Sequence, residues 1–281
     1  MRLNRWMLAG VGALMIAQAS VAMAGSIPWT SNWTAAQADA RRTGRLIMVD
    51  FFADWSLYSE NLDNQVFPDA SVVKAAAQFV PIRLNADAQG RQLAQKYGVT
   101  DFPTIAFVDA AGNFVDKIVG FEPAPAFAKE LDRIEQDAKE FPLLQRRVKA
   151  DPKDTPAAAR LAIDLIQRGR IDEAETLIRS METRGAAHPE LALTYQRMGD
   201  YYLDADRVKS AAPWYRKVLS VTSEPAEVSS AHFKLGVCDI VMKNTEAGEA
   251  EMKSVVDNPG APAALKDQAK QVLLQLKKKK S

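Results

Sequence analysis

The chain has 281 residues, with 36 lysines and arginines against 35 aspartates and glutamates, two histidines and a single cysteine. A nucleic-acid-binding surface needs basic residues clustered over one face, but the only basic run is Lys277 to Lys280, which we expect to be a solvated helix end. One cysteine cannot close an internal disulfide, so burial must stabilise the fold.

The first 24 residues have the pattern of a cleavable secretory signal. Two arginines precede an apolar run from Trp6 to Ala17, and an Ala-Met-Ala tripeptide ends at residue 24. The apolar run is too short to cross a bilayer as a helix. We therefore expect a mature chain of residues 25–281 that is periplasmic or secreted, with no stable membrane insertion.

Residues 25–141 alternate between helix and strand patterns. In chain order we expect a helix over 34–43, a strand over 46–52, helices over 56–66 and 68–78, a strand over 79–84, a helix over 89–97, strands over 104–108 and 114–119, and a helix over 124–139. The β-α-β order followed by β-β-α predicts a mixed sheet with helices on both faces.

From Pro142 to the end only helix patterns remain, and residues recur every 37 positions. Four columns share this period: Leu161-Ala162, Met198-Gly199 and Leu235-Gly236; Ala174, Ala211 and Gly248; Ile178, Tyr215 and Met252; Met181, Val218 and Val255. Small residues suit close helix crossings, and large residues fill the adjoining space. Residues 142–281 are therefore predicted to form an all-α array of helix pairs, ending in a capping helix over 263–279.

These columns resemble the tetratricopeptide repeat, although the period exceeds that family's usual ~34 residues. The best match is in the second unit, at Tyr195, Met198-Gly199, Tyr202, Ala211 and Tyr215. The resemblance implies a concave surface, lined by the first helix of each pair, that binds a polypeptide. Carried onto this chain, it gives four candidate binding residues: Gln196, Asp200, Asp204 and Phe233. For Phe233, packing within the repeats is an equally good interpretation.

The first half contains a motif that raises a chemical question, Phe-Phe-Ala-Asp-Trp-Ser-Leu-Tyr-Ser at 51–59. With cysteines at 56 and 59 it would be a Trp-Cys-x-x-Cys redox motif. Disulfide exchange needs a thiolate nucleophile and a second, resolving thiol. Ser56 and Ser59 supply neither.

Several stretches around this motif resemble the thioredoxin superfamily, with the greatest likeness to the C-terminal thioredoxin-like domain of bacterial thiol-disulfide interchange proteins. They are Val49 to Trp55, Val66 to Asp69, Tyr97 to Val99, Phe102 to Thr104 and Val119 to Phe121. The resemblance implies an α/β thioredoxin-like sandwich over residues 25–141, followed by the helical repeats.

The resemblance also gives roles to residues of this emptied active site. Trp55 would flank a peptide groove, or else be a half-buried core tryptophan. Pro103, after Phe102, would be the family's cis-proline beside an extended peptide, or a structural turn proline. Asp50 would be the family's buried carboxylate, which assists proton transfer to the resolving cysteine. Without that thiol, we expect Asp50 to form a hydrogen bond with Ser59 or with a water molecule and to have a raised pKa.

Other catalytic sites find little support in the sequence. A serine nucleophile needs a base such as histidine nearby, but His188 and His232 both fall in the repeats. We expect Ser56 to cap its helix, Cys238 to be a buried inert thiol, and no metal or cofactor to be bound. A lone reactive Cys238, forming a mixed disulfide with a partner, is the alternative.

Two functions from different classes remain open. The first is a redox-inactive binding protein that holds a polypeptide partner during folding or assembly in the periplasm. The second is a thiol-disulfide oxidoreductase by descent, whose active-site cysteines have been replaced by serines naturally or by engineering.

Overall fold

The computed structural model describes residues 25–184 and 189–280, so the expected signal and His188 lie outside the described residues. The first part of the chain forms a mixed sheet in the order β2-β1-β3-β4. The strands are β1 (Ile47–Phe52), β2 (Val80–Asn85), β3 (Thr104–Val108) and β4 (Phe114–Val119). β1 is parallel to β2, whereas β3 is antiparallel to both β1 and β4. The sheet is therefore mixed, as the order of elements predicts.

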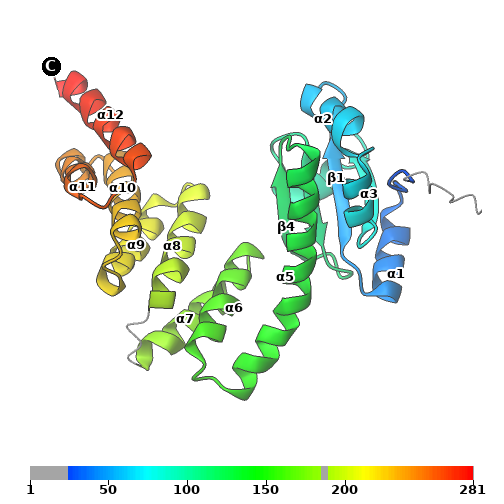
Figure 1. Cartoon of the computed structure of the whole chain (residues 1–281), viewed down its shortest axis with the longest axis horizontal. Helices are drawn as coiled ribbons and strands as arrows, with labels where there is room; N and C mark the ends of the chain where they lie inside the picture. The colour runs from blue at the N-terminus through cyan, green and yellow to red at the C-terminus, as the bar shows by residue number, and fades with distance from the viewer. Residues whose placement is uncertain (1–24, 185–188, 281) are drawn as a thin grey trace, which may run out of the picture.

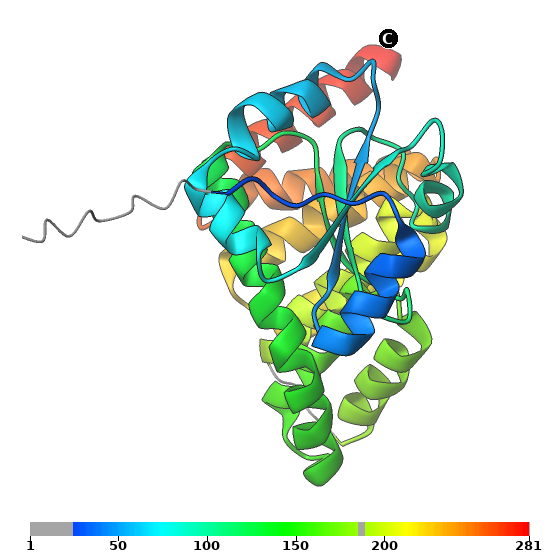
Figure 2. The ribbon, with the colours of Figure 1, turned by 90° about the vertical axis from the view of Figure 1, so that its right-hand side faces the viewer.

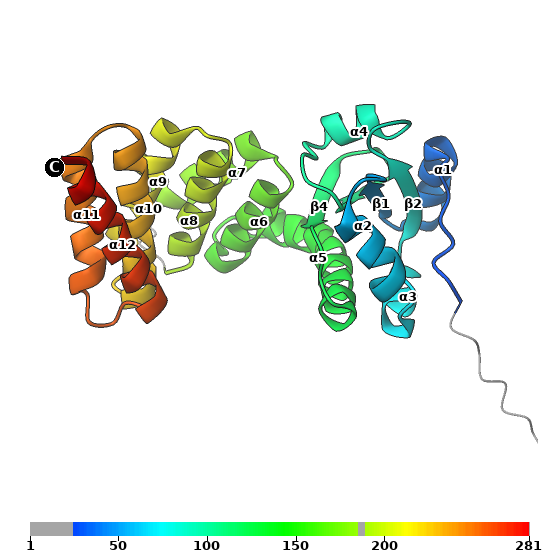
Figure 3. The ribbon, with the colours of Figure 1, turned by 90° about the horizontal axis from the view of Figure 1, so that it is seen from above.

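Helices cover both faces of the sheet (Figure 3). They are α1 (Trp33–Thr43), α2 (Leu57–Asn61), η1 (Leu62–Val66), α3 (Ala70–Ala76), α4 (Arg91–Lys96) and α5 (Ala124–Ala150). The alternation of side chains along β1 divides the core: Val49 and Phe51 pack with α1 and α4, while Met48 packs with η1, α3 and α5. The predicted α/β sandwich is therefore confirmed, with a hydrophobic layer on each face.

The last of these helices is longer than the sequence pattern predicts. We expect it to end at Lys139, before Pro142, yet α5 continues through Pro142 to Ala150. A proline inside a helix removes one backbone hydrogen bond. Here Phe141, Leu144 and Val148 pack against the core of the helical repeats, and this packing outweighs the cost. As a result, one continuous helix runs from the sheet to the repeats (Figures 1 and 2).

The remainder is all-helical, consistent with a tetratricopeptide-type domain. It contains α6 (Thr155–Gln167), α7 (Ile171–Thr183), α8 (Pro189–Asp204), α9 (Val208–Val221), α10 (Pro225–Val241), α11 (Thr245–Asp257) and α12 (Ala263–Lys280). The residues of the four repeat columns are all buried. Their small members mark close crossings: a Cβ added at Gly199 would lie 2.6 Å from Cε1 of Tyr215.

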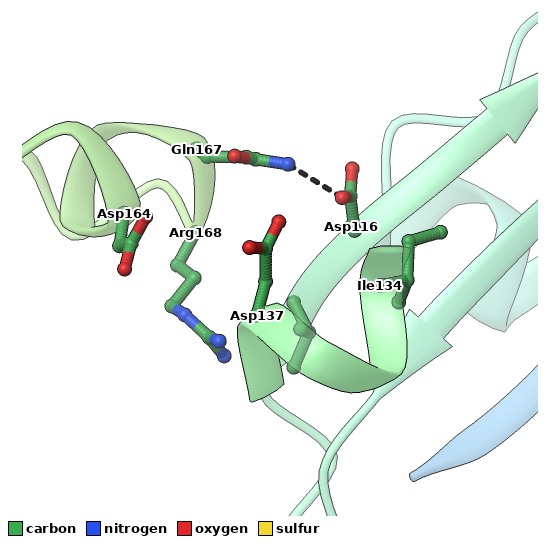
Figure 4. Close-up of a pocket in the computed structure, with 7 residues that line it drawn as sticks. Asp116, Ile134, Asp137, Asp164, Gln167 and Arg168 are labelled. Atoms are coloured by element: carbon green, nitrogen blue, oxygen red, sulfur yellow. Dashed lines mark hydrogen bonds between the residues drawn. The ribbon is translucent and has the colours of Figure 1, made fainter. Parts of the chain in front are cut away.

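Polar side chains join the sheet and α5 to the first repeat helix (Figure 4). Gln167 of α6 donates a hydrogen bond to the Asp116 carboxylate of β4. Nη2 of Arg160 lies 2.8 Å from Oδ1 of Asp137 on α5. Arg133 contacts both carboxylates, each at 2.6 Å. These contacts fix the repeats to the sheet domain.

Candidate functional site

The serine that replaces the first motif position begins α2. Oγ of Ser56 accepts a hydrogen bond from the Ser59 backbone N–H at 3.3 Å, which is the predicted helix cap. The same hydroxyl donates to the carbonyl oxygen of Phe102 at 2.9 Å. Ser56 therefore ties the start of the helix to the loop before β3.

That loop contains a cis peptide bond between Phe102 and Pro103. The Pro103 carbonyl accepts a hydrogen bond from the Gly120 N–H at 2.8 Å, so the loop is held from the β4 side as well. The Phe102 ring meets the Trp55 ring edge to face, with centroids 5.8 Å apart. The structure thus brings together four of the residues predicted from the sequence: Trp55, Ser56, Phe102 and Pro103.

Large apolar side chains are exposed where α2 begins. The exposed fractions are 69% for Trp55, 74% for Leu57 and 60% for Tyr58. The core interpretation of Trp55 is therefore wrong; its ring lies at the surface, where Nε1 donates to Oδ2 of Asp87 at 2.8 Å. We call Trp55, Leu57 and Tyr58, together with the half-buried Phe102, the apolar face.

Asp50 lies behind this surface on β1 and is only 1% exposed. The predicted hydrogen bond to Ser59 is not formed: within the described residues, neither carboxylate oxygen of Asp50 nor Oγ of Ser59 has a hydrogen-bond partner. Instead, Oδ2 of Asp50 lies 3.0 Å from Nε of Arg83, an ion-pair distance in which the N–H does not point at the oxygen. Burial raises the pKa of Asp50 to about 7, although the attraction of Arg83 opposes this shift.

Arg83 is the site residue that sequence reasoning missed. It pairs with Asp50 in the parallel register of β1 and β2. Its guanidinium also contacts Asp63 at 2.7 Å and lies 4.4 Å from the centre of the Phe52 ring. A usable signal was present, because Arg83 is a charged residue between two apolar ones in a predicted strand.

The site has no thiol. Cys238 lies on α10 and is fully buried, as predicted, and burial raises its pKa to about 11. His232 is near α11, with Nδ1 2.6 Å from Oε2 of Glu251. Across the described ranges, no group of three or more His, Cys, Asp or Glu side chains is arranged to hold a metal ion.

The repeat candidates fall into two groups. Asp204 is exposed and Gln196 is half-buried, so both are accessible at the surface of α8. Asp200 is committed to internal contacts: Oδ1 accepts hydrogen bonds from Oη of Tyr215 and from Nζ of Lys234, each at 2.8 Å. Asp200 is therefore less available to a partner than Gln196 and Asp204 are.

Phe233 packs inside the repeat domain. Together with Val237 and Ile240 it lies against the small cluster built by Met252 and the C-terminal helix. This arrangement favours the packing interpretation of Phe233. α8 and the apolar face also lie apart, because α5 and α6 stand between α2 and α8 (Figures 1 and 3).

Comparison with known families agrees with this geometry. Residues 33–135 match the model described as a thioredoxin-like domain, so this part of the chain is a thioredoxin-like domain. In the part of the chain that the structure describes, no helix has the length and apolar character needed to cross a membrane.

Within the superfamily, the chain is similar to the "Thiol:disulfide interchange protein DsbD" of several bacteria. It is 36% identical over 98 residues to that of Ralstonia nicotianae and 33% identical over 100 residues to that of Vibrio vulnificus. These alignments cover 34% of this chain but only 16% and 17% of the relatives, so the chain spans about one sixth of their length. A crystal structure of the Neisseria meningitidis DsbD C-terminal domain in the reduced form aligns with a TM-score of 0.33 at 17% identity, covering 36% of this chain and 90% of that one.

Proposed function

We propose that this chain is an exported polypeptide-binding protein whose thioredoxin-like domain holds an extended segment without exchanging disulfides. The observation that carries the proposal is the apolar face, where Trp55, Leu57 and Tyr58 are each at least 60% exposed. Clustered exposed apolar side chains mark interaction sites more often than single ones do. One of them, Trp55, packs against Phe102 in the loop before β3, beside which an extended chain would lie in this proposal.

The absence of redox chemistry in this proposal follows from the side chains at the site. A serine hydroxyl cannot form or resolve a mixed disulfide, because both steps need sulfur. The one thiol, Cys238, is buried in another domain. The hydroxyl of Ser56 is engaged in the two hydrogen bonds that fasten α2 to Phe102.

In this proposal the helical repeats give a second, more polar contact surface. Gln196 and Asp204 are accessible on α8, and the Lys234 ammonium balances the charge of Asp200 between them. Such a surface suits a polar peptide better than a purely apolar one. We place the partner in the periplasm because of the signal-like pattern before Gly25 and the interchange proteins among the relatives.

The second candidate is a thiol-disulfide oxidoreductase silenced by the two serines. It is supported by the rest of the site: the helix start, the cis bond at Pro103 and the buried Asp50 are all in place. In that case the apolar face would be a remnant of substrate binding, and relatives with cysteines at both positions would be expected.

A capture experiment tests the role of the apolar face. The chain from residue 25 onward, immobilised, should retain a defined set of periplasmic polypeptides from a thiol-blocked extract. Leu57→Ser/Tyr58→Ser should lose most of this set, whereas Leu143→Ser, which removes an exposed leucine from α5, should not. Asp204→Ala tests the repeat contribution. Equal capture by wild type and by the double variant would overturn the role of the apolar face.

A further inference from the structure

A cleft of about 560 Å³ lies between the thioredoxin-like domain and the first repeat helices. Its walls come from the end of α4, the β3–β4 turn, α5 and the α6–α7 turn, and its aromatic part comprises Tyr97, Phe114 and Phe141. This volume falls within the roughly 300–1,000 Å³ typical of small-molecule sites.

The charged residues that line the cleft are mostly basic. Lys96 reaches it from the thioredoxin-like domain, while Arg168 and Arg170 reach it from the repeats. The one carboxylate of the lining, Asp109, is used by the β3–β4 turn, where it accepts hydrogen bonds from the backbone N–H groups of Ala111 and Asn113 at 2.8 and 2.9 Å. The cleft therefore presents positive charge to an occupant.

Two of the three cations already have protein partners. Arg170 makes a paired contact with Glu173, with both nitrogen–oxygen distances 2.7 Å. Nζ of Lys96 donates to the Gly112 carbonyl at 2.9 Å, which leaves its charge uncompensated by any carboxylate at that contact. Both residues can attract an anion at longer range, but each already has a hydrogen-bond partner in the protein.

Arg168 is different. Its guanidinium carbon lies 4.0 Å from the centre of the Phe141 ring. Within the described chain, none of the guanidinium N–H groups donates a hydrogen bond or lies within 4.0 Å of a carboxylate. Burial lowers its pKa, and the charge of Arg170 acts in the same direction. The carboxylates of Asp116, Asp137 and Asp164 attract it at longer range.

Those three carboxylates do not use Arg168 as a direct partner. Asp116 and Asp137 are bound by Arg133, and Asp137 and Asp164 are contacted by Arg160. A half-buried guanidinium stacked on an aromatic ring has lost hydration without gaining hydrogen bonds. An anion in the cleft would restore them.

We propose that this cleft binds a small organic anion whose carboxylate, phosphate or sulfonate group pairs with Arg168 and whose apolar part lies against Phe141 and Phe114. Arg168 offers the planar fork of donors that such groups match. Lys96, across the cleft, attracts the same charge. The proposal is independent of polypeptide binding, because Leu46 of the cleft precedes β1 whereas Ser56 follows its other end.

The test uses 8-anilinonaphthalene-1-sulfonate, an aromatic anion whose fluorescence rises on binding, titrated against the chain from residue 25 onward. N-phenyl-1-naphthylamine, which has the same rings without the sulfonate, is the neutral comparison. Arg168→Met removes the donors, and Ala138→Trp fills the cleft from α5 while keeping the charge. Arg146→Met, which removes an exposed arginine of α5 outside the cleft, is the matched control.

We expect saturable binding of the sulfonate that Arg168→Met weakens at least about tenfold, as loss of a charge-assisted hydrogen bond predicts. Ala138→Trp should abolish it, while Arg146→Met and Leu57→Ser should leave it unchanged. An unchanged affinity in Ala138→Trp, equal binding of the neutral probe, or loss of binding in Leu57→Ser alone would overturn the proposal. If Arg168→Met does not fold, Ala138→Trp decides.

Discussion

Oδ2 of Asp50 lies 3.0 Å from Nε of Arg83, across the two parallel strands β1 and β2. Asp50 is almost fully buried, whereas Arg83 reaches out to Asp63 and the Phe52 ring. Asp50 is thus a buried carboxyl group beside one cationic neighbour, whose side chain is 25% exposed. Its protonation should therefore be visible in the stability of the domain.

The free energy of unfolding should fall as pH rises from about 4 to about 7. The pKa of Asp50 is about 7 in the folded chain and 3.8 as an ordinary aspartate, so between these values the folded state keeps a proton that the unfolded state has lost. The contribution is complete below pH 4 and is lost above pH 7. Its size is on the order of 1.4 kcal/mol per pKa unit.

Asp50→Asn removes the titrating group and should flatten this slope. Urea denaturation of wild type and variant at several pH values between 4 and 8 measures the difference. Asp204→Asn, at an exposed carboxylate, should keep the wild-type profile. Parallel profiles for wild type and Asp50→Asn would show that Asp50 does not titrate in this range.

Restoring two thiols should restore disulfide exchange. In Ser56→Cys/Ser59→Cys, the first thiol would lie at the start of α2, beside cis-Pro103, with the buried carboxylate of Asp50 behind it. A helix N-terminus stabilises a thiolate. We expect this variant, and not the wild type, to accelerate the reduction of insulin by dithiothreitol. Ser56→Cys alone, which lacks the resolving thiol, is the control; an inactive double variant would mean that the site geometry has also been lost.

The repeat columns predict a steric cost at their small positions. Gly199→Ala would place a Cβ 2.6 Å from Cε1 of Tyr215, a ring that is fully buried. Overpacking of this kind costs about 1–3 kcal/mol, measured by chemical denaturation. Combining it with Tyr215→Leu should cost less than the sum of the two single changes, because the smaller side chain removes the clash. Additive costs would contradict a direct contact.

Cys238 should not react in the folded chain. It is fully buried on α10, and burial raises its pKa to about 11, so the thiolate is scarce at neutral pH. Labelling with 5,5′-dithiobis(2-nitrobenzoate) should be slow in native buffer and immediate in guanidinium chloride. Rapid native labelling would revive the mixed-disulfide alternative.

The sequence was a good guide wherever a pattern repeats or alternates. The apolar run of β1, the order of elements and the 37-residue columns predicted the mixed sheet and the helix pairs. The predicted end of α5 was wrong because Pro142 is a local signal for the end of a helix. The helix continues because Leu144 and Val148 pack against residues that are distant in sequence. Local propensity cannot register such packing.

The candidate site shows the same division. Serine at position 56 predicted a helix cap, and Ser56 caps α2 in the structure. The partner of Asp50 depends on strand register: Ser59 was nearer in sequence, but Arg83 is adjacent in space. Trp55 contacts Phe102 on a loop distant in sequence, and α12 packs against Phe233 from outside its own repeat. None of these contacts follows from spacing alone.

The most direct test of the central claim measures binding of an unfolded polypeptide that has no free thiol. Fluorescein-labelled, reduced and carboxymethylated ribonuclease A, titrated with the chain from residue 25 onward, reports binding by fluorescence anisotropy. We predict saturable binding that Leu57→Ser/Tyr58→Ser weakens at least about tenfold, the effect of losing two exposed apolar anchors, and that Leu143→Ser leaves unchanged. No binding by the wild type, or equal affinity for all three proteins, would contradict a polypeptide-binding role for the apolar face.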